Sequence, residues 1–506
     1  MRRAAATALR RLFRILGKTA LAAALAAPVW AQTELEKLYA EAQRAQASHD
    51  IPGAIRSYEA IVHLEPRMAE AHANLGNLYY QQGQTAHARA EYKRAVALKP
   101  ALTGPHFFLG VIAFNDHDYA AALDHLGRAA AGPSPNPLIY AYLGYARFAR
   151  GEYAEAAANL ESAAGLDPGN IDVLYHLSKS YGHLAENALA RLHASFPASV
   201  YPILVRAHLS EEKEDWQDTA RQYNLALQKM PENARLRQKA EWSAAKAAGK
   251  TAKPPDAAPD ELIDGSLAYK EAPPAGLKLQ DEIARRQAQV RAFAAAANND
   301  RQLYLEGEGY HVLAYLTSLA VIGLNEDSYR AHQLRAQMFE AANNDDGAIA
   351  EYREALKRKA DLPNVHFAIG SLYWKDHRVD DARPELEQEL KTNPHHPQAL
   401  YELGDIAAFT GHPEAAEKFF LRALNLEPGM AEAHYAIEKI YTDSRRYDES
   451  IEHLRAALKI NPSEPTAHYR LALVYRKMGR PQDAERELAL FDRSKAVAQN
   501  GSSTVR

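Results

Sequence analysis

The feature that most constrains this chain is a unit of 34 residues that recurs in register along most of its length. Copies begin at residues 69, 103 and 137, and again at 363, 397, 431 and 465. Within each copy the apolar residues fall three or four apart, which is the period of a helix. Two helices this short cannot bury their apolar faces alone, so successive copies must stack and share a core. The repeat predicts an all-α fold, an α-solenoid of stacked helix-turn-helix units.

Small residues recur at two positions of the unit. Because two helices cross closely only where neither presents a bulky side chain, small residues twelve apart mark the crossing of the first and second helices. Position 8 is glycine in five copies: Gly76, Gly110, Gly144, Gly370 and Gly404. Position 20 is alanine in eight: Ala54, Ala88, Ala122, Ala156, Ala348, Ala382, Ala416 and Ala484. Proline, which cannot continue a helix, closes the second helix of most copies.

This pattern resembles the tetratricopeptide repeat family. The resemblance rests on the small residues at positions 8 and 20, on leucine or an aromatic residue at position 24, on alanine at 27 and on proline at 32. It covers roughly residues 35–233 and 300–491. The resemblance implies that the first helices of successive repeats line a concave groove, and that positions 2, 5, 6, 9, 12 and 13 of each first helix face it.

The chain is expected to contain two arrays of such repeats, over 32–249 and 279–494. A segment rich in proline and alanine at 250–278 has the composition of a linker between them. The polar residues 495–506 are expected to form a disordered tail. Residues 174–198 and 303–327 lack a turn signal, so each is expected to be one long helix or a helix pair with an abrupt join.

The first 31 residues have the pattern of a signal peptide. Six basic residues precede a short alanine-rich apolar run, and Val29-Trp30-Ala31 has the form of a cleavage site. We therefore expect cleavage after Ala31 and a periplasmic or secreted protein with no integral membrane segment after signal removal. Arg10-Arg11 leaves twin-arginine export open behind general secretion, and a mitochondrial presequence is the less favoured alternative.

Charge and composition narrow the classes of partner. The chain without residues 1–31 keeps 54 basic and 64 acidic residues, a net charge of −10. Non-specific binding of nucleic acid requires clustered positive charge, so no nucleic-acid partner is expected. Cysteine is absent, which excludes disulfides and thiol chemistry.

No catalytic motif is recognisable in the sequence, and we expect a protein that is not an enzyme and uses no cofactor and no metal. Histidine occupies position 4 in six copies: His72, His106, His332, His366, His434 and His468. One histidine per repeat is too widely spaced for a shared metal ion. Position 4 is a packing position in the family that the repeats resemble, and we expect these histidines to pack.

The family's groove positions select the candidate binding residues. In the first array these residues combine aromatic rings with side-chain amides, which suits an extended peptide. They are Asn74, Asn77, Tyr80, Phe107, Phe108, Phe114, Asn115, Tyr142, Tyr145 and Phe148. In the second array basic residues accumulate toward the C-terminus, which suits an acidic partner segment but is also common on solvated helix faces. These residues are Trp374, Lys375, Tyr401, Tyr435, Lys439, Tyr469, Arg470, Arg476 and Lys477.

The sequence thus predicts a non-catalytic protein–protein interaction scaffold or adaptor in the bacterial periplasm, which binds peptide segments or partner proteins in the groove. The alternative is a glycan-binding component of envelope or polysaccharide biogenesis or export, in which the same aromatic rings stack on sugars.

Overall fold

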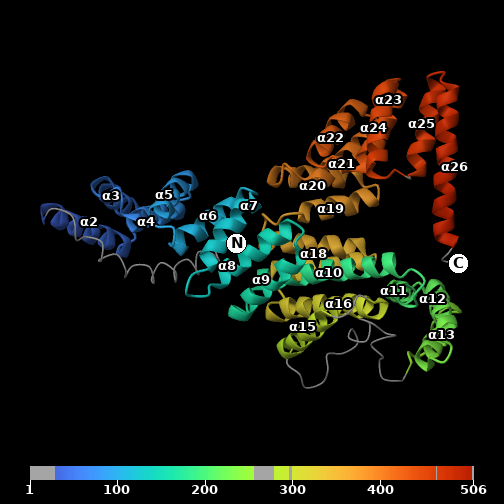
Figure 1. Cartoon of the computed structure of the whole chain (residues 1–506), viewed down its shortest axis with the longest axis horizontal. Coiled ribbons are helices and arrows are strands. Elements are labelled where there is room, and N and C mark those ends of the chain that lie inside the picture. The colour runs from blue at the N-terminus through green and yellow to red at the C-terminus, as the bar shows by residue number, and fades with distance from the viewer. Residues whose placement is uncertain (1–28, 256–278, 296–298, 463, 504–506) are drawn as a thin grey trace. The chain divides into compact units, whose positions relative to one another are not determined.

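A computed structural model describes residues 29–255, 279–295, 299–462 and 464–503 (Figure 1). These residues form 24 helices and no strand. The expected all-α solenoid of stacked helix pairs is therefore confirmed. Within the described residues no helix combines the length and the apolar composition that a membrane span requires. The predicted signal peptide, at 1–31, lies almost wholly outside the described residues, as does most of the predicted linker at 250–278.

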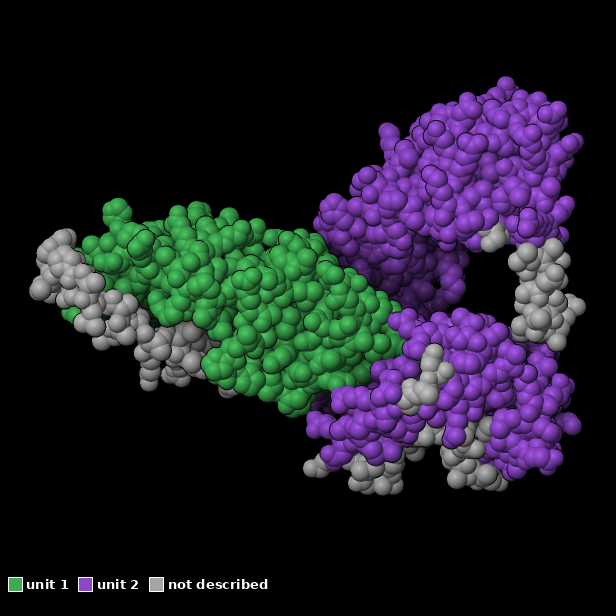
Figure 2. Space-filling view, viewed as in Figure 1, with its two compact units in different colours: residues 1–184 green, residues 185–506 purple. Residues whose placement is uncertain are grey.

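The chain divides into two compact units, residues 1–184 and 185–506 (Figure 2). The first unit contains α2 (Val29–Ala47), α3 (Ile51–Leu64), α4 (Ala69–Gln81), α5 (Thr85–Leu98), α6 (Thr103–Asn115), α7 (Tyr119–Ala130), α8 (Pro137–Ala149), α9 (Tyr153–Leu166) and the first part of α10 (Ile171–Ser195).

The second unit contains the rest of α10 and all later helices. These are α11 (Tyr201–Glu212), α12 (Trp216–Lys229), α13 (Ala234–Ala247), α15 (Leu279–Ala295), α16 (Asp300–Leu324), α17 (Tyr329–Ala341), α18 (Asp345–Arg358), α19 (Val365–Lys375), α20 (Val379–Thr392), α21 (Pro397–Phe409), α22 (Pro413–Leu426), α23 (Ala431–Asp443), α24 (Tyr447–Ile460), α25 (Pro465–Lys477) and α26 (Pro481–Ser503).

The helix pairs coincide with the repeats of the sequence. The residue at position 15 of the repeat, which joins the two helices, has a left-handed backbone in every such pair. Glycine adopts that conformation at no steric cost, as Gly83 and Gly411 do. His117, His377 and Arg445 adopt it too, at a cost of about 1 kcal/mol each. Since the tight turn persists without glycine, the packing of the two helices must impose it.

The long segments without a turn signal are single helices. Both α10 and α16 have 25 residues, which confirms the first of the two expected readings. Leu303 and Tyr304 of α16 are buried with Leu204 and Tyr223 of α11 and α12. Residues of both predicted arrays therefore share one core inside the second unit. The predicted division into two arrays at 250–278 differs from the division into compact units, and it stays a prediction.

At the C-terminal end, α26 continues through Ser503. The sequence predicted a disordered tail over 495–506, and the helix occupies most of that range.

In the five repeats that have glycine at position 8, the crossing of the two helices depends on that glycine. A methyl group built on Gly110 of α6 would lie 2.6 Å from the Leu126 side chain of α7 and 3.2 Å from the Leu126 backbone nitrogen. Gly404 of α21 approaches the Phe420 ring of α22 in the same way. Leu126 and Phe420 are fully buried, so neither side chain has room to move. The predicted small-residue crossing is confirmed at these positions.

A matched pair of variants tests this packing. Gly110→Ala should lower the free energy of unfolding by ~1 to 3 kcal/mol, because the added methyl group overpacks a filled core. Gly127→Ala, in the same repeat, should raise it by ~0.5 to 1 kcal/mol, because that site on α7 is open and alanine favours a helix. Urea unfolding followed by circular dichroism measures both. Equal effects of the two substitutions would contradict the crossing argument.

Candidate functional site

The first helices of the repeats carry two different surfaces, one in each unit. In the first unit, rings at positions 6, 9 and 12 form a continuous row from α4 to α10. Tyr80 contacts Phe108 with ring centres 5.1 Å apart, and Phe114 contacts Tyr142 at 5.5 Å. The row continues from Tyr145 to His176 of α10 at 4.6 Å. The rings of neighbouring repeats thus pack against one another.

Much of this row is core. Among the predicted groove residues of the first unit, Asn77, Phe107, Phe108 and Tyr145 are buried. Asn74, Tyr80, Phe114, Tyr142 and Phe148 are half-buried, and Asn115 is exposed. The two asparagines hold tyrosines: Asn77 accepts a hydrogen bond from the Tyr92 hydroxyl at 2.8 Å, and Asn74 donates one to the Tyr58 hydroxyl at 3.2 Å.

The buried residues of this set therefore pack in the core, whether or not they also contact a ligand. Among these predicted residues, only the half-buried side chains and the exposed Asn115 offer surface to a ligand in this conformation. A binding role for the whole set stays a prediction.

In the second unit the predicted groove residues are more exposed to solvent than those of the first unit. Lys375, Lys439, Tyr469, Arg476 and Lys477 are exposed, and Trp374, Tyr401, Tyr435 and Arg470 are half-buried. Two of the basic residues are used inside the unit. Lys375 pairs with Asp345 at 2.6 Å, and Arg470 pairs with Glu438 at 2.8 Å. Lys439, Arg476 and Lys477 form no ion pair with any described residue.

The least expected feature of the second unit is a pair of carboxyl groups on α21. Glu402 and Asp405 lie one helical turn apart and both are half-buried. Ser371 of the neighbouring first helix, α19, donates its hydroxyl to the Glu402 carboxyl, with oxygen separations of 2.7 and 2.8 Å. The Tyr401 hydroxyl hydrogen-bonds Asp405. Within the described residues no lysine, arginine or histidine forms an ion pair with either carboxyl group.

Burial without a cation changes the protonation of these groups. Burial, reinforced by the charge of Asp405, raises the pKa of Glu402 to about 7, although the Ser371 hydrogen bond opposes the shift. Burial also raises the pKa of Asp405, against the hydrogen bond from Tyr401. A positive charge placed beside this pair would offset the cost of keeping it ionised.

Aromatic side chains flank the carboxyl pair. Phe409 lies one turn beyond Asp405 on α21 and is 64% exposed, which is unusual for a phenylalanine. Its ring contacts Trp374 of α19 at 5.6 Å and stacks near His377 at 6.1 Å. We call Ser371, Trp374, Glu402, Asp405 and Phe409 the α19–α21 face. It combines an exposed apolar anchor with carboxyl groups that have no basic partner in the described part of the chain.

Of the residues in this face, only Trp374 is among the groove residues predicted from the sequence. The position rule that selects Tyr401 at position 5 also selects Glu402 at position 6, Asp405 at position 9 and Phe409 at position 13. The signal was therefore present in the sequence. What the sequence could not supply was the hydrogen bond from Ser371 and the lack of a nearby cation, since both depend on how α19 and α21 pack.

No group of three or more histidine, aspartate or glutamate side chains in the described residues is placed to hold a metal ion. The position-4 histidines are buried or half-buried within their own repeats, as expected for packing residues.

The pKa of Glu402 gives a direct test. A carboxyl group with a raised pKa destabilises the fold when it ionises, so its cost is absent near pH 4 and complete above pH 7. Glu402→Gln should therefore raise the free energy of unfolding by ~1 to 3 kcal/mol at pH 8 and by almost nothing at pH 4.5. Urea unfolding at both pH values measures the difference. The same gain at both pH values would contradict a buried titrating carboxyl group.

A family model described as "Tetratricopeptide repeat" matches residues 39–102, 107–171 and 367–432, and one described as "TPR repeat" matches 439–479. No curated protein matches the chain.

Solved structures with a similar arrangement include three shorter proteins. The MamA protein is 21% identical and covers 33% of this chain and 92% of its own, with a TM-score of 0.32. YrrB, described as a TPR protein with an unusual peptide-binding site, is 18% identical over 35% of this chain and 92% of its own, with a TM-score of 0.32. PilF of Pseudomonas aeruginosa is 17% identical over 43% of this chain and 93% of its own, with a TM-score of 0.34.

Proposed function

Since this chain belongs to the tetratricopeptide-repeat family, we propose that it is a non-catalytic scaffold that binds peptide segments of partner proteins on the first-helix faces of its repeats. Stacked repeats of this kind expose long faces that suit extended ligands. The α19–α21 face is the primary binding site in this proposal. Its ligand is a peptide segment that carries a lysine or arginine beside an apolar side chain.

One observation supports this proposal above the others: Glu402 and Asp405 are half-buried carboxyl groups with no basic partner in the described residues, beside an exposed phenylalanine. Elsewhere in the same unit, the buried Glu438 has Arg470, and the buried Glu389 accepts two backbone amides. A basic side chain of a ligand would supply the missing charge, and Phe409 and Trp374 would cover the adjacent apolar group.

The neighbouring first helices extend the site. Lys439 of α23 and Arg476 of α25 are exposed and form no ion pair within the described residues. They support the expectation of an acidic segment further along the same ligand. The proposed ligand is therefore an extended peptide with a basic residue at α21 and acidic residues toward α25.

Peptide selection on the full mature chain tests the proposal. A random peptide library displayed on phage should yield binders enriched in lysine or arginine next to an apolar residue. The double variant Glu402→Gln, Asp405→Asn should lose that enrichment, because amides of the same shape carry no charge. Glu414→Gln, an exposed glutamate of α22, is the matched control and should keep it.

Affinity for a selected peptide should fall up to about tenfold per pH unit below pH 7, because the ligand must then displace the proton of Glu402. An unchanged enrichment in the double variant would overturn the proposed site. Binding of oligosaccharides with no enrichment of any peptide would instead favour the glycan-binding alternative.

We further propose that the scaffold acts in the bacterial periplasm after removal of residues 1–31. The sequence pattern of basic residues, apolar run and cleavage site supports this. Expression of the full gene in a Gram-negative host should give a periplasmic protein whose first residue is Gln32. Mass spectrometry of the purified N-terminus and cell fractionation measure this. A cytosolic protein that retains residues 1–31 would overturn it.

A further inference from the structure

Six repeats join their two helices through the histidine at position 4. In each of them a ring nitrogen of this histidine lies within 3.0 Å of the side chain at position 23, nineteen residues later on the second helix. Four partners are glutamates: His72–Glu91, His332–Glu351, His366–Glu385 and His468–Glu487. In the other two repeats the partner is a second histidine: His106–His125 and His434–His453. Each unit contains one such histidine pair.

The hydrogen bonds fix how protons are placed in a histidine pair. The Nε2 of His106 lies 3.1 Å from the carbonyl oxygen of Pro100, which can only accept, so this nitrogen carries a proton. The Nδ1 of a neutral His106 is then an acceptor, and the Nδ1 of His125, 3.0 Å away, must donate. His434 has the same arrangement, with Pro428 at 3.2 Å and His453 at 2.9 Å.

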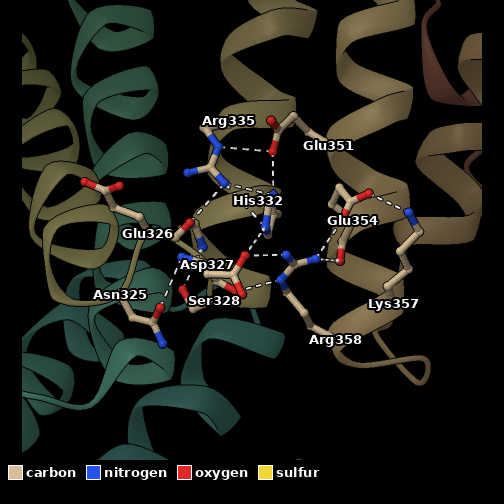
Figure 3. Close-up of polar contacts among 11 residues, drawn as sticks. Asn325, Glu326, Asp327, Ser328, His332, Arg335, Glu351, Glu354, Lys357 and Arg358 are labelled. Atoms are coloured by element: carbon tan, nitrogen blue, oxygen red, sulfur yellow. Dashed lines mark hydrogen bonds and ion pairs between the residues drawn. The ribbon is translucent and has the colours of Figure 1, made fainter.

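The histidine–glutamate repeats behave differently. Figure 3 shows His332 between Asp327 and Glu351, with Nδ1 2.6 Å from the Glu351 carboxylate and Nε2 3.6 Å from Asp327. Arg335 bonds the same carboxylate at 3.1 Å. The partner at position 23 of these repeats is a carboxylate, which only accepts, so an N–H at Nδ1 has an acceptor there. In the repeat of His332, Arg335 also lies 2.8 Å from this Nδ1. A proton added to His106 makes its Nδ1 a donor, so His125 can accept only by moving its own proton to Nε2. A second proton makes both Nδ1 atoms donors and leaves two positive rings 3.0 Å apart.

The groups around the pairs do not compensate for that charge. Around His106 and His125 these groups are Asp124 and Arg128 of α7 and Lys93 of α5. Burial lowers the pKa of both histidines, and the cations Arg128 and Lys93 lower that of His125 further, against Asp124.

Around His434 and His453 the facing groups are Glu417 of α22 and Tyr441 of α23. Glu417 is itself paired with Arg446. Burial, followed by His434, lowers the pKa of His453 to about 4.

We propose that the repeats at 103–136 and 431–464 are acid-sensitive joints, one in each unit, at which mild acid loosens the first helix from the second while the histidine–glutamate repeats stay closed. The joint consists of α6 and α7 in the first unit and of α23 and α24 in the second. This role is independent of any ligand.

The sign of the effect follows from the lowered pKa values. An unfolded histidine titrates near pH 6.5. A histidine whose pKa is lower in the folded state contributes stability above that pH, and the contribution is lost as the pH falls from about 6.5 toward the folded value of about 4 for His453. At pH 5 the local opening of α23 and α24 should increase several-fold. The full difference between the unfolded and folded pKa values corresponds to an increase of roughly 30-fold at pH 5. The increase should stay below this ceiling, because water screens the charge of the half-buried ring.

Hydrogen exchange of the full mature chain at pH 7.5 and pH 5.0, followed by mass spectrometry and corrected for the intrinsic exchange rates, tests the proposal. Protection should fall at pH 5.0 in α6, α7, α23 and α24 more than in α19 and α20, whose pair is His366–Glu385. Equal loss of protection in all repeats, or no loss in the two joints, would overturn it.

Reciprocal substitutions separate the histidine pair from the rest of the repeat. His125→Glu converts the first joint into a histidine–glutamate repeat, with Arg128 and Lys93 near the new charge, and should remove its acid sensitivity. Glu385→His creates a histidine pair in α19 and α20 and should make that repeat acid-sensitive. If His125→Glu does not fold by circular dichroism, His125→Gln takes its place. An acid response that persists in the folded variant would contradict the assignment to the pair.

Discussion

The close crossing of two helices at a small residue is the constraint on which the rest of this molecule depends. Glycine at position 8 lets the side chain at position 24 of the second helix fill the space beside it, as Leu126 does at Gly110 and Phe420 at Gly404. With the crossing fixed, the turn at position 15 must be left-handed, whichever residue occupies it. The crossing also fixes which positions of the first helix remain open to a neighbour or to a ligand.

Polar groups that the crossing buries are satisfied inside the repeats. In the repeat at 431, position 8 is Glu438 instead of glycine and position 20 is Ser450. Thr442 donates to Glu438 at 2.9 Å and shares a hydrogen bond with Ser450 at 2.8 Å, while Arg470 of the next repeat neutralises the carboxylate. In this repeat a network of polar side chains therefore takes the place of the close approach between a glycine at position 8 and the second helix. The histidine at position 4 has a similar role, because its ring links the two helices of its repeat. In three repeats the ring also contacts a proline carbonyl before the first helix: His72–Pro66, His106–Pro100 and His434–Pro428.

The α19–α21 face differs from the rest of the second unit in the partners of its carboxyl groups. Glu389 on α20 is fully buried and carries no cation, but it accepts the backbone amides of Asn364 and Phe367 at 3.1 and 3.4 Å, so it caps the start of α19. Glu402 and Asp405 have a hydroxyl group each and no basic partner among the described residues. The buried glutamates of the described residues contact a basic side chain or, at Glu389, two backbone amides, whereas Glu402 and Asp405 have neither. This contrast supports a ligand of positive charge.

The sequence by itself determined the repeat, the helix pairs and the crossing residues, because each follows from spacing along the chain. It left open whether 174–198 and 303–327 form single helices, which the structure decided. It also gave the groove positions, and these include Glu402, Asp405 and Phe409. Only the tertiary structure decided which groove residues are open. Phe107, Phe108 and Tyr145 occupy groove positions and yet are buried, because the rings of adjacent repeats pack on one another. It also decided that position 4 pairs with position 23, with glutamate in four repeats and histidine in two. These are contacts between separate helices, and no spacing within one helix encodes them.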